Sequence, residues 1–512
     1  MGHHRKRAAA AAALALATAL SITATASADN VVHYVSRPDL QPPKLTVNAS
    51  GRGQAPGFIF VANFQNKFIN SPLVGQGGAL ILDNKGHLVW SRPVAAGVDT
   101  LNLEAQRYQG KPVLTWWQGV VSGKTGEMTG TWYVGNDRYK PIARIAGANG
   151  WDPSAHEFII TSRGTALVTA YKHVPADTTA VGGTENGQLL DSGVLEFDIK
   201  TGRLLHEWSA AAHIPMDQSY SRTSPQNPNA FDAYHINSID VDAAGNWLVS
   251  MRNTWAIYKV DAKTGAILWT LGGKANSFGF GDNVHFAFQH NARWLPNGQV
   301  SMFDNECCAI IPQPDGTVKP GPAVNGNSRG LVIKLDEAKK TAAFVFDRKL
   351  YELVSGTQGN LQTLPNGNEM IGWGQQPFFS EFSKAGKLLL SIRFPDPDIS
   401  YRAYRLPWHG RPSGRPAVAV RAVSGGRTRV YISWNGATDV VSYQVLSGRS
   451  SRKLALVKRV HRGGFETAVS VHGKGLLYRV KAVDARGRVL GTSALITRSG
   501  GNTKGTEPAP VY

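Results

Sequence analysis

The chain has 512 residues, 42% hydrophobic and 18% charged, which excludes an intrinsically disordered protein and leaves room for two or three globular domains. Its two cysteines are adjacent, Cys307 and Cys308, so a disulfide scaffold and a structural zinc site built from cysteine pairs are both excluded. The formal charge of +19 is uneven, because residues 411–505 carry 18 Lys or Arg against three acidic residues while residues 29–410 are nearly neutral.

Residues 1–28 have the pattern of a secretory signal peptide. Basic residues from Arg5 to Arg7 precede an Ala- and Leu-rich run, and a small-residue motif ends at Ala28, where cleavage is expected. The apolar run is too short to cross a bilayer comfortably, and no later stretch reaches roughly 18 to 20 apolar residues. The sequence therefore predicts a secreted or cell-wall-associated protein without a transmembrane segment. In such an oxidising compartment the two adjacent thiols are expected to close on each other or to stay as a buried dithiol.

A unit of four strands recurs between residues 29 and 410. Each unit has a first hairpin with a glycine in its turn, then a longer loop and a second hairpin. The turn glycines are Gly110, Gly164, Gly245, Gly298 and Gly367. Six second hairpins predict an all-β, six-bladed β-propeller. Long loops at residues 171–187 and 210–233 are expected to build the mouth of a site at one end of its channel.

The composition changes to Gly, Pro and Arg at residues 411–416, which predicts a linker. Residues 417–499 then alternate at period two, with a Trp on an early strand and a Tyr-x-Val-x-Ala-x-Asp strand late, and resemble a fibronectin type III sandwich. A loose tail is expected at residues 500–512. The strong positive charge of this region suits an anionic cell-wall polymer, or serves only as a solubilising surface; no specific nucleic acid is expected.

One hairpin concentrates reactive side chains. Residues 234–240 alternate like a strand, residues 242–246 have turn chemistry, and residues 247–251 alternate again. This pattern is expected to place His235 and Asn237 on one face, with Arg252 returning beside them.

Histidine recurs at matching positions of three successive units. His156, His235 and His290 each stand eight to ten residues before the turn glycine of their own unit. A single histidine is more often structural, but equivalent positions on consecutive inner strands face the same end of a propeller channel. The spacing therefore predicts that the three imidazoles converge in one site.

The segments YHINSID (residues 234–240), QHNARW (289–294) and GWGQ (372–375), together with Arg252, resemble the arylsulfate sulfotransferase family. These are exported propeller enzymes that move a sulfuryl group between phenols without the nucleotide donor PAPS. The resemblance implies that His290 becomes transiently sulfated. It places His156, His235, Asn237 and Arg252 around the sulfuryl group.

The chemistry that the resemblance implies suits these residue types. A neutral imidazole nitrogen attacks sulfur and releases the phenol, and a second phenol then collects the sulfuryl group in a ping-pong cycle. Arg252 and Asn237 are expected to hold sulfuryl oxygens, while His156 or His235 exchanges the phenolic proton. No cofactor and no metal are expected. Four aromatic residues are expected to stack on the aryl ring of the substrate: Trp255, Trp373, Phe378 and Phe379.

Two other functions remain open from the sequence. Residues 261–269 fit the Asp-x-x-Thr-Gly-x-x-x-Trp repeat of pyrroloquinoline quinone dehydrogenases, although only one full match occurs. The other alternative is a non-catalytic exported binding propeller, in which the histidines are structural.

Overall fold

A computed structural model describes residues 30–123, 125–307, 310–312, 318–320, 324, 326–472 and 475–498. The fold is all-β, as predicted, with three short 3₁₀ turns named among these residues: η2 (Thr179–Val181), η3 (Met216–Gln218) and η4 (Pro296–Gly298). The predicted signal peptide, residues 1–28, and the predicted tail from residue 500 lie outside the described residues. No helix in the described part of the chain has the length and hydropathy that a bilayer crossing needs.

Six sheets of four or five strands follow one another along residues 46–406. The first contains β2 (Phe58–Gln65), β3 (Gly78–Leu82), β4 (Leu88–Pro93), β28 (Asp398–Ile399) and β29 (Tyr404–Leu406). The second contains β5 (Asp99–Tyr108), β6 (Lys111–Val121), β7 (Met128–Gly135) and β8 (Pro141–Ile145). The third contains β9 (Asp152–Ile160), β10 (Thr165–Ala176), β11 (Gly187–Asp198) and β12 (Leu204–Ser209).

The remaining sheets repeat this order. The fourth contains β13 (Ile236–Val241), β14 (Trp247–Met251), β15 (Ala256–Val260) and β16 (Ile267–Gly272). The fifth contains β18 (His290–Leu295), β19 (Gln299–Asp304), β22 (Arg329–Asp336), β23 (Thr341–Arg348) and β17 (Gly279–Phe280). The sixth contains β24 (Asn360–Thr363), β25 (Glu369–Gly372), β26 (Phe378–Phe382), β27 (Leu388–Arg393) and β1 (Thr46–Ser50). A separate hairpin joins β20 (Ile310–Pro312) to β21 (Val318–Pro320).

The sheets close into a ring, which is the arrangement of a β-propeller. Each sheet packs on the next, and the sixth contacts the first through β25 and β29. Strands from the two ends of this region share the first sheet, where β2 pairs with β28 and β29. Every sheet of the ring therefore has a neighbour on both sides, which limits exposed strand edges.

The inner strands of the ring are irregular at one end. The register shifts next to Leu101 on β5, Ile236 on β13 and His290 on β18, and the shift in the pairing of β9 lies between Val168 and Ala170 of its partner β10. A β-bulge bends a strand and redirects its side chains. The bulges therefore set the side-chain directions at this end of the channel.

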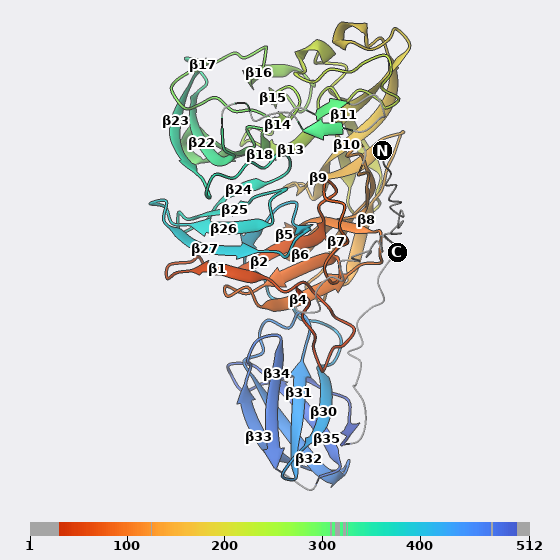
Figure 1. Ribbon diagram of the computed structural model, residues 1–512, viewed down its shortest axis with the longest axis vertical. Helices are drawn as coiled ribbons and strands as arrows, with labels where there is room; N and C mark the ends of the chain where they lie inside the picture. Colours follow the sequence, from red (N-terminus) through yellow and green to blue (C-terminus); the bar gives the residue numbers. More distant parts are fainter. Residues whose placement is uncertain are drawn as a thin grey trace, which may run out of the picture.

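Residues 417–497 form two further sheets that pack on each other below the propeller (Figure 1). One contains β30 (Ala417–Val423), β31 (Arg427–Ser433) and β34 (Glu466–His472). The other contains β32 (Ser442–Ser450), β33 (Lys453–His461), β35 (Leu477–Val483), β36 (Val489–Thr492) and β37 (Ile496–Thr497). Trp434 and the inward residues of β35 form its core, as their alternation predicts. Its assignment to the fibronectin type III class stays a prediction.

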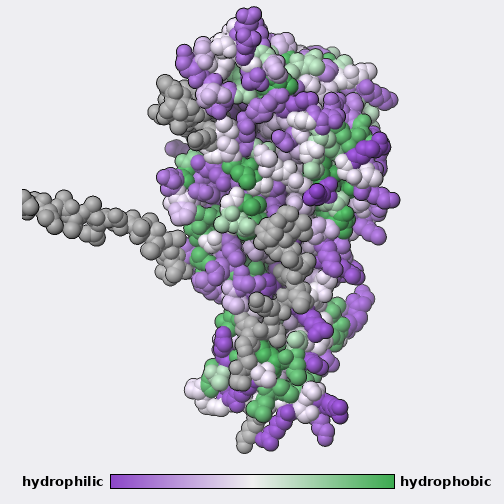
Figure 2. Space-filling view, turned by 90° about the vertical axis from the view of Figure 1, so that its right-hand side faces the viewer, coloured by the Kyte–Doolittle hydropathy of each residue, from purple (hydrophilic) through white to green (hydrophobic). Residues whose placement is uncertain are grey.

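This sandwich is fixed to the propeller by buried polar contacts. Asn435 bonds the backbone of Ser91 on β4 twice, at 2.9 and 2.8 Å. The Tyr139 hydroxyl donates to the Gly436 carbonyl at 2.7 Å and accepts from Trp408 Nε1 at 2.9 Å. On the face shown in Figure 2, hydrophobic residues gather on the sandwich and reach the surface in smaller patches along the propeller.

Candidate active site

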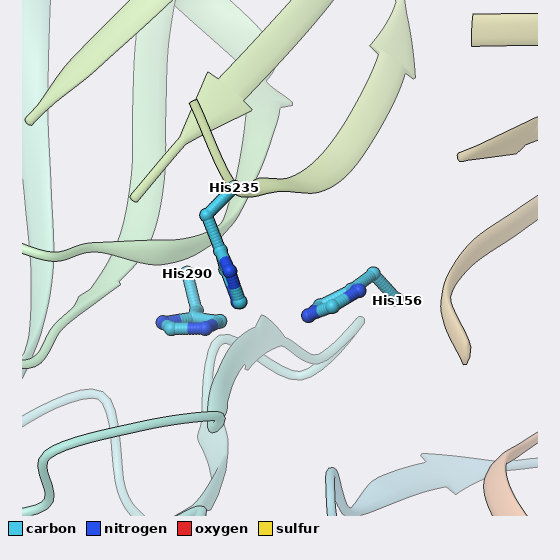
Figure 3. A group of neighbouring side chains, drawn as sticks. All are labelled: His156, His235 and His290. Atoms are coloured by element: carbon cyan, nitrogen blue, oxygen red, sulfur yellow. The ribbon is translucent and has the colours of Figure 1, made fainter. Parts of the chain in front are cut away.

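Three histidines from three neighbouring sheets meet at one end of the channel. His156 lies on β9, His235 directly precedes β13, and His290 begins β18. One ring nitrogen of each lies within 4.8 Å of the others. The rings point toward a common space (Figure 3), with centroids separated by 5.0 Å for one pair and 6.5 Å for the other two. The structure thus brings together the three residues that the repeat spacing relates.

His235 is oriented by a carboxylate that sequence reasoning missed. Its Nδ1 lies 2.5 Å from Asp232 Oδ2, and its backbone N–H donates to Asp232 Oδ1 at 3.0 Å. A carboxylate acceptor keeps a proton on Nδ1, so Nε2 is the ring nitrogen that is left to face the other rings. His235 has a φ of 54°, which turns the strand entry so that both contacts form. The spacing of three residues between Asp232 and His235 in the sequence could have predicted this contact.

His290 has a tautomer fixed by two acceptors. Its Nδ1 lies 2.8 Å from Asn305 Oδ1 and 3.1 Å from the Phe288 carbonyl. The Asn305 amide nitrogen donates to the carbonyls of Ser355 and Gln358, which fixes its oxygen toward the histidine. His290 Nδ1 therefore carries the proton, and Nε2 is the lone-pair nitrogen. Asn305 gave no signal in the sequence, because it belongs to the segment after β19.

The Nε2 atom of His290 accepts a bond from the Gln358 backbone N–H at 3.3 Å. Burial lowers the pKa of His290 well below 6.5, and Arg252 adds to this because a second cation nearby is unfavourable. The imidazole is therefore neutral near pH 7. A neutral, oriented Nε2 is the form of histidine that acts as a nucleophile.

His156 is 2% exposed, and its Nδ1 lies 3.1 Å from the Ser154 hydroxyl, which in turn contacts the Thr169 hydroxyl at 2.8 Å. Burial lowers the pKa of His156 well below 6.5, and the neighbouring His235 and His290 lower it further. This ring is neutral too. A hydroxyl both donates and accepts, so this contact permits either tautomer.

Arg252 reaches the site, whereas Asn237 does not. The Arg252 guanidinium lines the histidine cavity, donates to Asn253 Oδ1 and the Gly356 carbonyl, and stacks over Phe288 at 4.6 Å. Burial lowers its pKa to about 10, so it stays a cation at neutral pH. The Asn237 amide instead donates to the Gln289 carbonyl and accepts from the Asn291 N–H, which joins the fourth sheet to the fifth.

The histidines and Arg252 lie in the polar part of a cavity that is open at one side. Other polar residues also line this cavity: Lys67, Ser122, Thr125, Thr357 and Gln358. The apolar wall comes from the first two sheets and the loops beside them: Phe64, Phe68, Leu101, Val121 and Met128. Sequence reasoning missed these residues, because each reads as an ordinary strand or loop position.

The four predicted aryl-binding aromatics lie elsewhere in the described structure. Trp373 and Phe379 are fully buried between sheets, and Phe378 packs beside Trp373. Trp255 stacks on Tyr220 with centroids 3.7 Å apart. None of the four lines the cavity. A role of these four residues in binding the aryl ring stays a prediction, since apolar burial between sheets and apolar burial against a ligand look alike in a sequence.

Cys307 is buried and disulfide-bonded. Cys308, the other cysteine of the sequence, lies outside the described residues.

The three ring nitrogens also have the donor set of a zinc site. A divalent ion there would face the Arg252 cation, and it would displace the Gln358 N–H from His290 Nε2. The residues 261–269 form the β15–β16 turn, in which Asp261 accepts from the backbone of Lys263 and Thr264, and Trp269 Nε1 donates to Glu337. The quinoprotein-like match is therefore accounted for by a turn and its packing.

A ring of small antiparallel sheets around a buried centre of three histidines and an arginine defines a β-propeller with a candidate active site at one end of its channel. The family described as Arylsulfotransferase (ASST) matches residues 104–395, more than half of the chain and all three histidines. The chain belongs to this family.

Solved structures with low sequence identity also match. A Bacteroides caccae protein of unknown function is 14% identical, with 68% of this chain and 98% of that chain covered and a TM-score of 0.40. A catalytically inactive variant of virginiamycin B lyase from Staphylococcus aureus, with Quinupristin, is 11% identical, with 76% and 93% covered and a TM-score of 0.27. Likenesses this weak carry no functional argument. No curated protein matches the sequence.

Proposed function

We propose that this protein is a PAPS-independent aryl sulfotransferase that works by a ping-pong mechanism through a sulfohistidine at His290. The observation that carries the proposal is the fixed tautomer of His290, whose Nδ1 proton is held by Asn305 while Nε2 faces the cavity. Family membership supports the reaction class. The attack of His290 Nε2 on sulfur is the part of the proposal that goes beyond family membership.

In the first half-reaction His290 Nε2 releases the Gln358 N–H and attacks the sulfur of an aryl sulfate, so that the S–N bond forms and the S–O(aryl) bond breaks. Arg252 offers positive charge to the sulfuryl oxygens, whose charge grows in a loose transition state. His156 can donate a hydrogen bond from its Nε2–H group to a sulfuryl oxygen when the Ser154 hydroxyl donates to its Nδ1.

We assign the proton transfer to His235. The Asp232 carboxylate stabilises its imidazolium, which protonates the departing phenolate. The resulting neutral His235 then takes the proton of the acceptor phenol as that oxygen attacks sulfur and the S–N bond breaks. This cycle returns every residue to its starting state and uses no cofactor.

The decisive test combines 4-nitrophenyl sulfate as donor with phenol as acceptor. We expect release of 4-nitrophenol, and a sulfuryl mass on the peptide containing His290 after rapid quench without acceptor. His290→Ala should lower kcat at least ~10³-fold, because the nucleophile is lost. His173→Ala, at a half-exposed histidine on β10, should leave kcat unchanged.

No release above background, or a sulfuryl adduct on another residue, would sink the mechanism. Activity that disappears on treatment with a metal chelator and returns with zinc would favour a metal centre at the same histidines instead.

The predicted signal peptide and the positively charged sandwich bear on where the enzyme acts. We infer that the enzyme acts outside the cell, and that its sandwich attaches to an anionic wall polymer. The exposed faces of β31 and β33 carry arginine and lysine side chains, and charge complementarity to a polyanion supports this attachment.

A further inference from the structure

The turn between β2 and β3 places large apolar side chains at the cavity mouth. Phe68 lines the cavity yet is 50% exposed, and its neighbour Ile69 is 42% exposed. Single exposed apolar residues are ordinary, but Phe68 combines its exposure with a place in the cavity lining, where it can contact a ligand.

The exposure of Phe68 is built into the turn. Its backbone N–H donates to Asn66 Oδ1 at 3.1 Å, and the N–H of Ile69 donates to the Asn66 carbonyl at 3.0 Å. The Gln65 side chain donates to the Ser71 carbonyl at 2.6 Å and closes the same turn. The backbone is thus held in a shape that presents Phe68 outward.

Two links tie this turn to the reacting end of the cavity. The Asn66 amide donates to the Gln375 carbonyl, and the Gln375 side chain accepts from the N–H of Gly356, whose carbonyl binds Arg252. On the other side, Asp99 accepts from Lys67 Nζ at 2.9 Å and from the Val121 N–H at 3.1 Å. Phe68 and Ile69, which we call the apolar rim, therefore have a fixed position relative to Arg252 and the histidines.

The same pairing removes charge from the rim. Lys67 lines the cavity, but its ammonium contacts both oxygens of Asp99 and is balanced by that carboxylate. The wall behind it is Phe64, Leu101 and Met128, all buried. A ring system in the cavity can contact this apolar wall between Phe68 and the histidines, while the loop of Ser122 and Thr125 lines another part of the cavity.

We propose that the preferred substrates are phenols and aryl sulfates with an extended, uncharged apolar body of two or more rings, which covers Phe68 and Ile69 while the reacting oxygen sits at the histidines. The proposal rests on the proposed function. It adds a substrate class, because the one-ring compounds used to detect transfer would leave the rim exposed. Contact with the rim then contributes binding energy that a single ring does not obtain.

The test compares phenol with 4-phenylphenol as acceptors, with 4-nitrophenyl sulfate as donor. We expect the wild type to have a kcat/KM at least ~10-fold higher for 4-phenylphenol. Phe68→Ser should lower that value about 10-fold and change the value for phenol less than about twofold. Leu268→Ser, at a 48% exposed leucine on β16, is the matched control and should change neither.

Equal kcat/KM values for the two acceptors in the wild type, or an equal loss for both in Phe68→Ser, would overturn the inference while the transferase stands. If no transfer occurs, the proposed function fails, and calorimetric titration with phenyl sulfate and 4-phenylphenyl sulfate decides the rim separately. Tighter binding of the larger ester, lost in Phe68→Ser, supports it; indistinguishable affinities refute it.

Discussion

At the scale of single residues, the site depends on which nitrogen of each imidazole carries a proton. The partners that decide this are Asp232 for His235 and Asn305 for His290. Both partners fix Nδ1 as the protonated atom and leave Nε2 toward the cavity. The chemistry therefore depends on residues that do not themselves touch the substrate.

Replacing Asp232 tests this dependence. In Asp232→Asn one oxygen remains to accept from the His235 backbone N–H, and the new NH₂ group then faces Nδ1. That contact favours the tautomer with the proton on Nε2, which is the wrong form for a base. We expect kcat to fall about 10² to 10⁴-fold, with an unchanged circular dichroism spectrum.

Asp282→Asn, at an exposed carboxylate, is the control and should retain full activity. A kcat within about twofold of the wild type in Asp232→Asn would show that another group transfers the proton.

At the scale of elements, the loop between β23 and β24 carries Gly356, Thr357 and Gln358 to the histidines. This loop packs against Gly374, just after β25. A Cβ at Gly374 would lie 2.4 Å from the Thr357 carbonyl oxygen and 2.7 Å from the Gln358 carbonyl carbon. The close approach explains why this position needs glycine.

Gly374→Ala should therefore displace the loop and shift the Gln358 carbonyl that fixes Asn305, and with it His290. We expect a fall in kcat of at least ~10-fold, because a shift of about 1 Å in a reacting group has effects of this order or larger. Steady-state kinetics with 4-nitrophenyl sulfate measure it.

Gly245→Ala is the matched control, because Gly245 also has a positive φ, of 90°, but no atom lies within 4 Å of the added Cβ. Both variants bear a similar backbone cost of about 1 kcal/mol. If Gly374→Ala and Gly245→Ala lost the same activity, the loss would be due to reduced stability alone.

At the scale of the whole molecule, the sandwich and the propeller share a polar and aromatic interface. On the propeller side Trp90 stacks on Tyr139 with centroids 4.6 Å apart, and the Tyr139 hydroxyl donates to the Gly436 carbonyl. Asn435 bonds both backbone groups of Ser91. These groups are buried, so each lost bond leaves an unsatisfied partner.

Asn435→Ala should destabilise the protein by about 1 to 3 kcal/mol and lower its melting temperature. The rate of 4-nitrophenol release should not change, because the histidine cavity is lined by other residues. Gln188→Ala, at an exposed amide on β11, should alter neither property. A lower rate at a temperature where the variant is fully folded would instead show that the sandwich influences the site.

The sequence by itself determined the local pattern and its repetition. Alternation and turn chemistry predicted the hairpin that β13 and β14 form, because these signals act between residues close in the chain. The similar spacing of His156, His235 and His290 from their turns, eight to ten residues, predicted their convergence, because a repeated unit places equivalent residues at the same end of a ring.

Only the tertiary structure decided the contacts between units. Asn237 shares a strand with the site but turns to the neighbouring sheet, since a register shift after Ile236 redirects the strand. Asn305 reaches His290, and Gln358 and Phe68 reach the cavity, from segments between strands or just after them, whose course no periodicity fixes. The repeat thus places His290, the proposed nucleophile, whereas its tautomer and the proposed substrate surface depend on contacts across the ring.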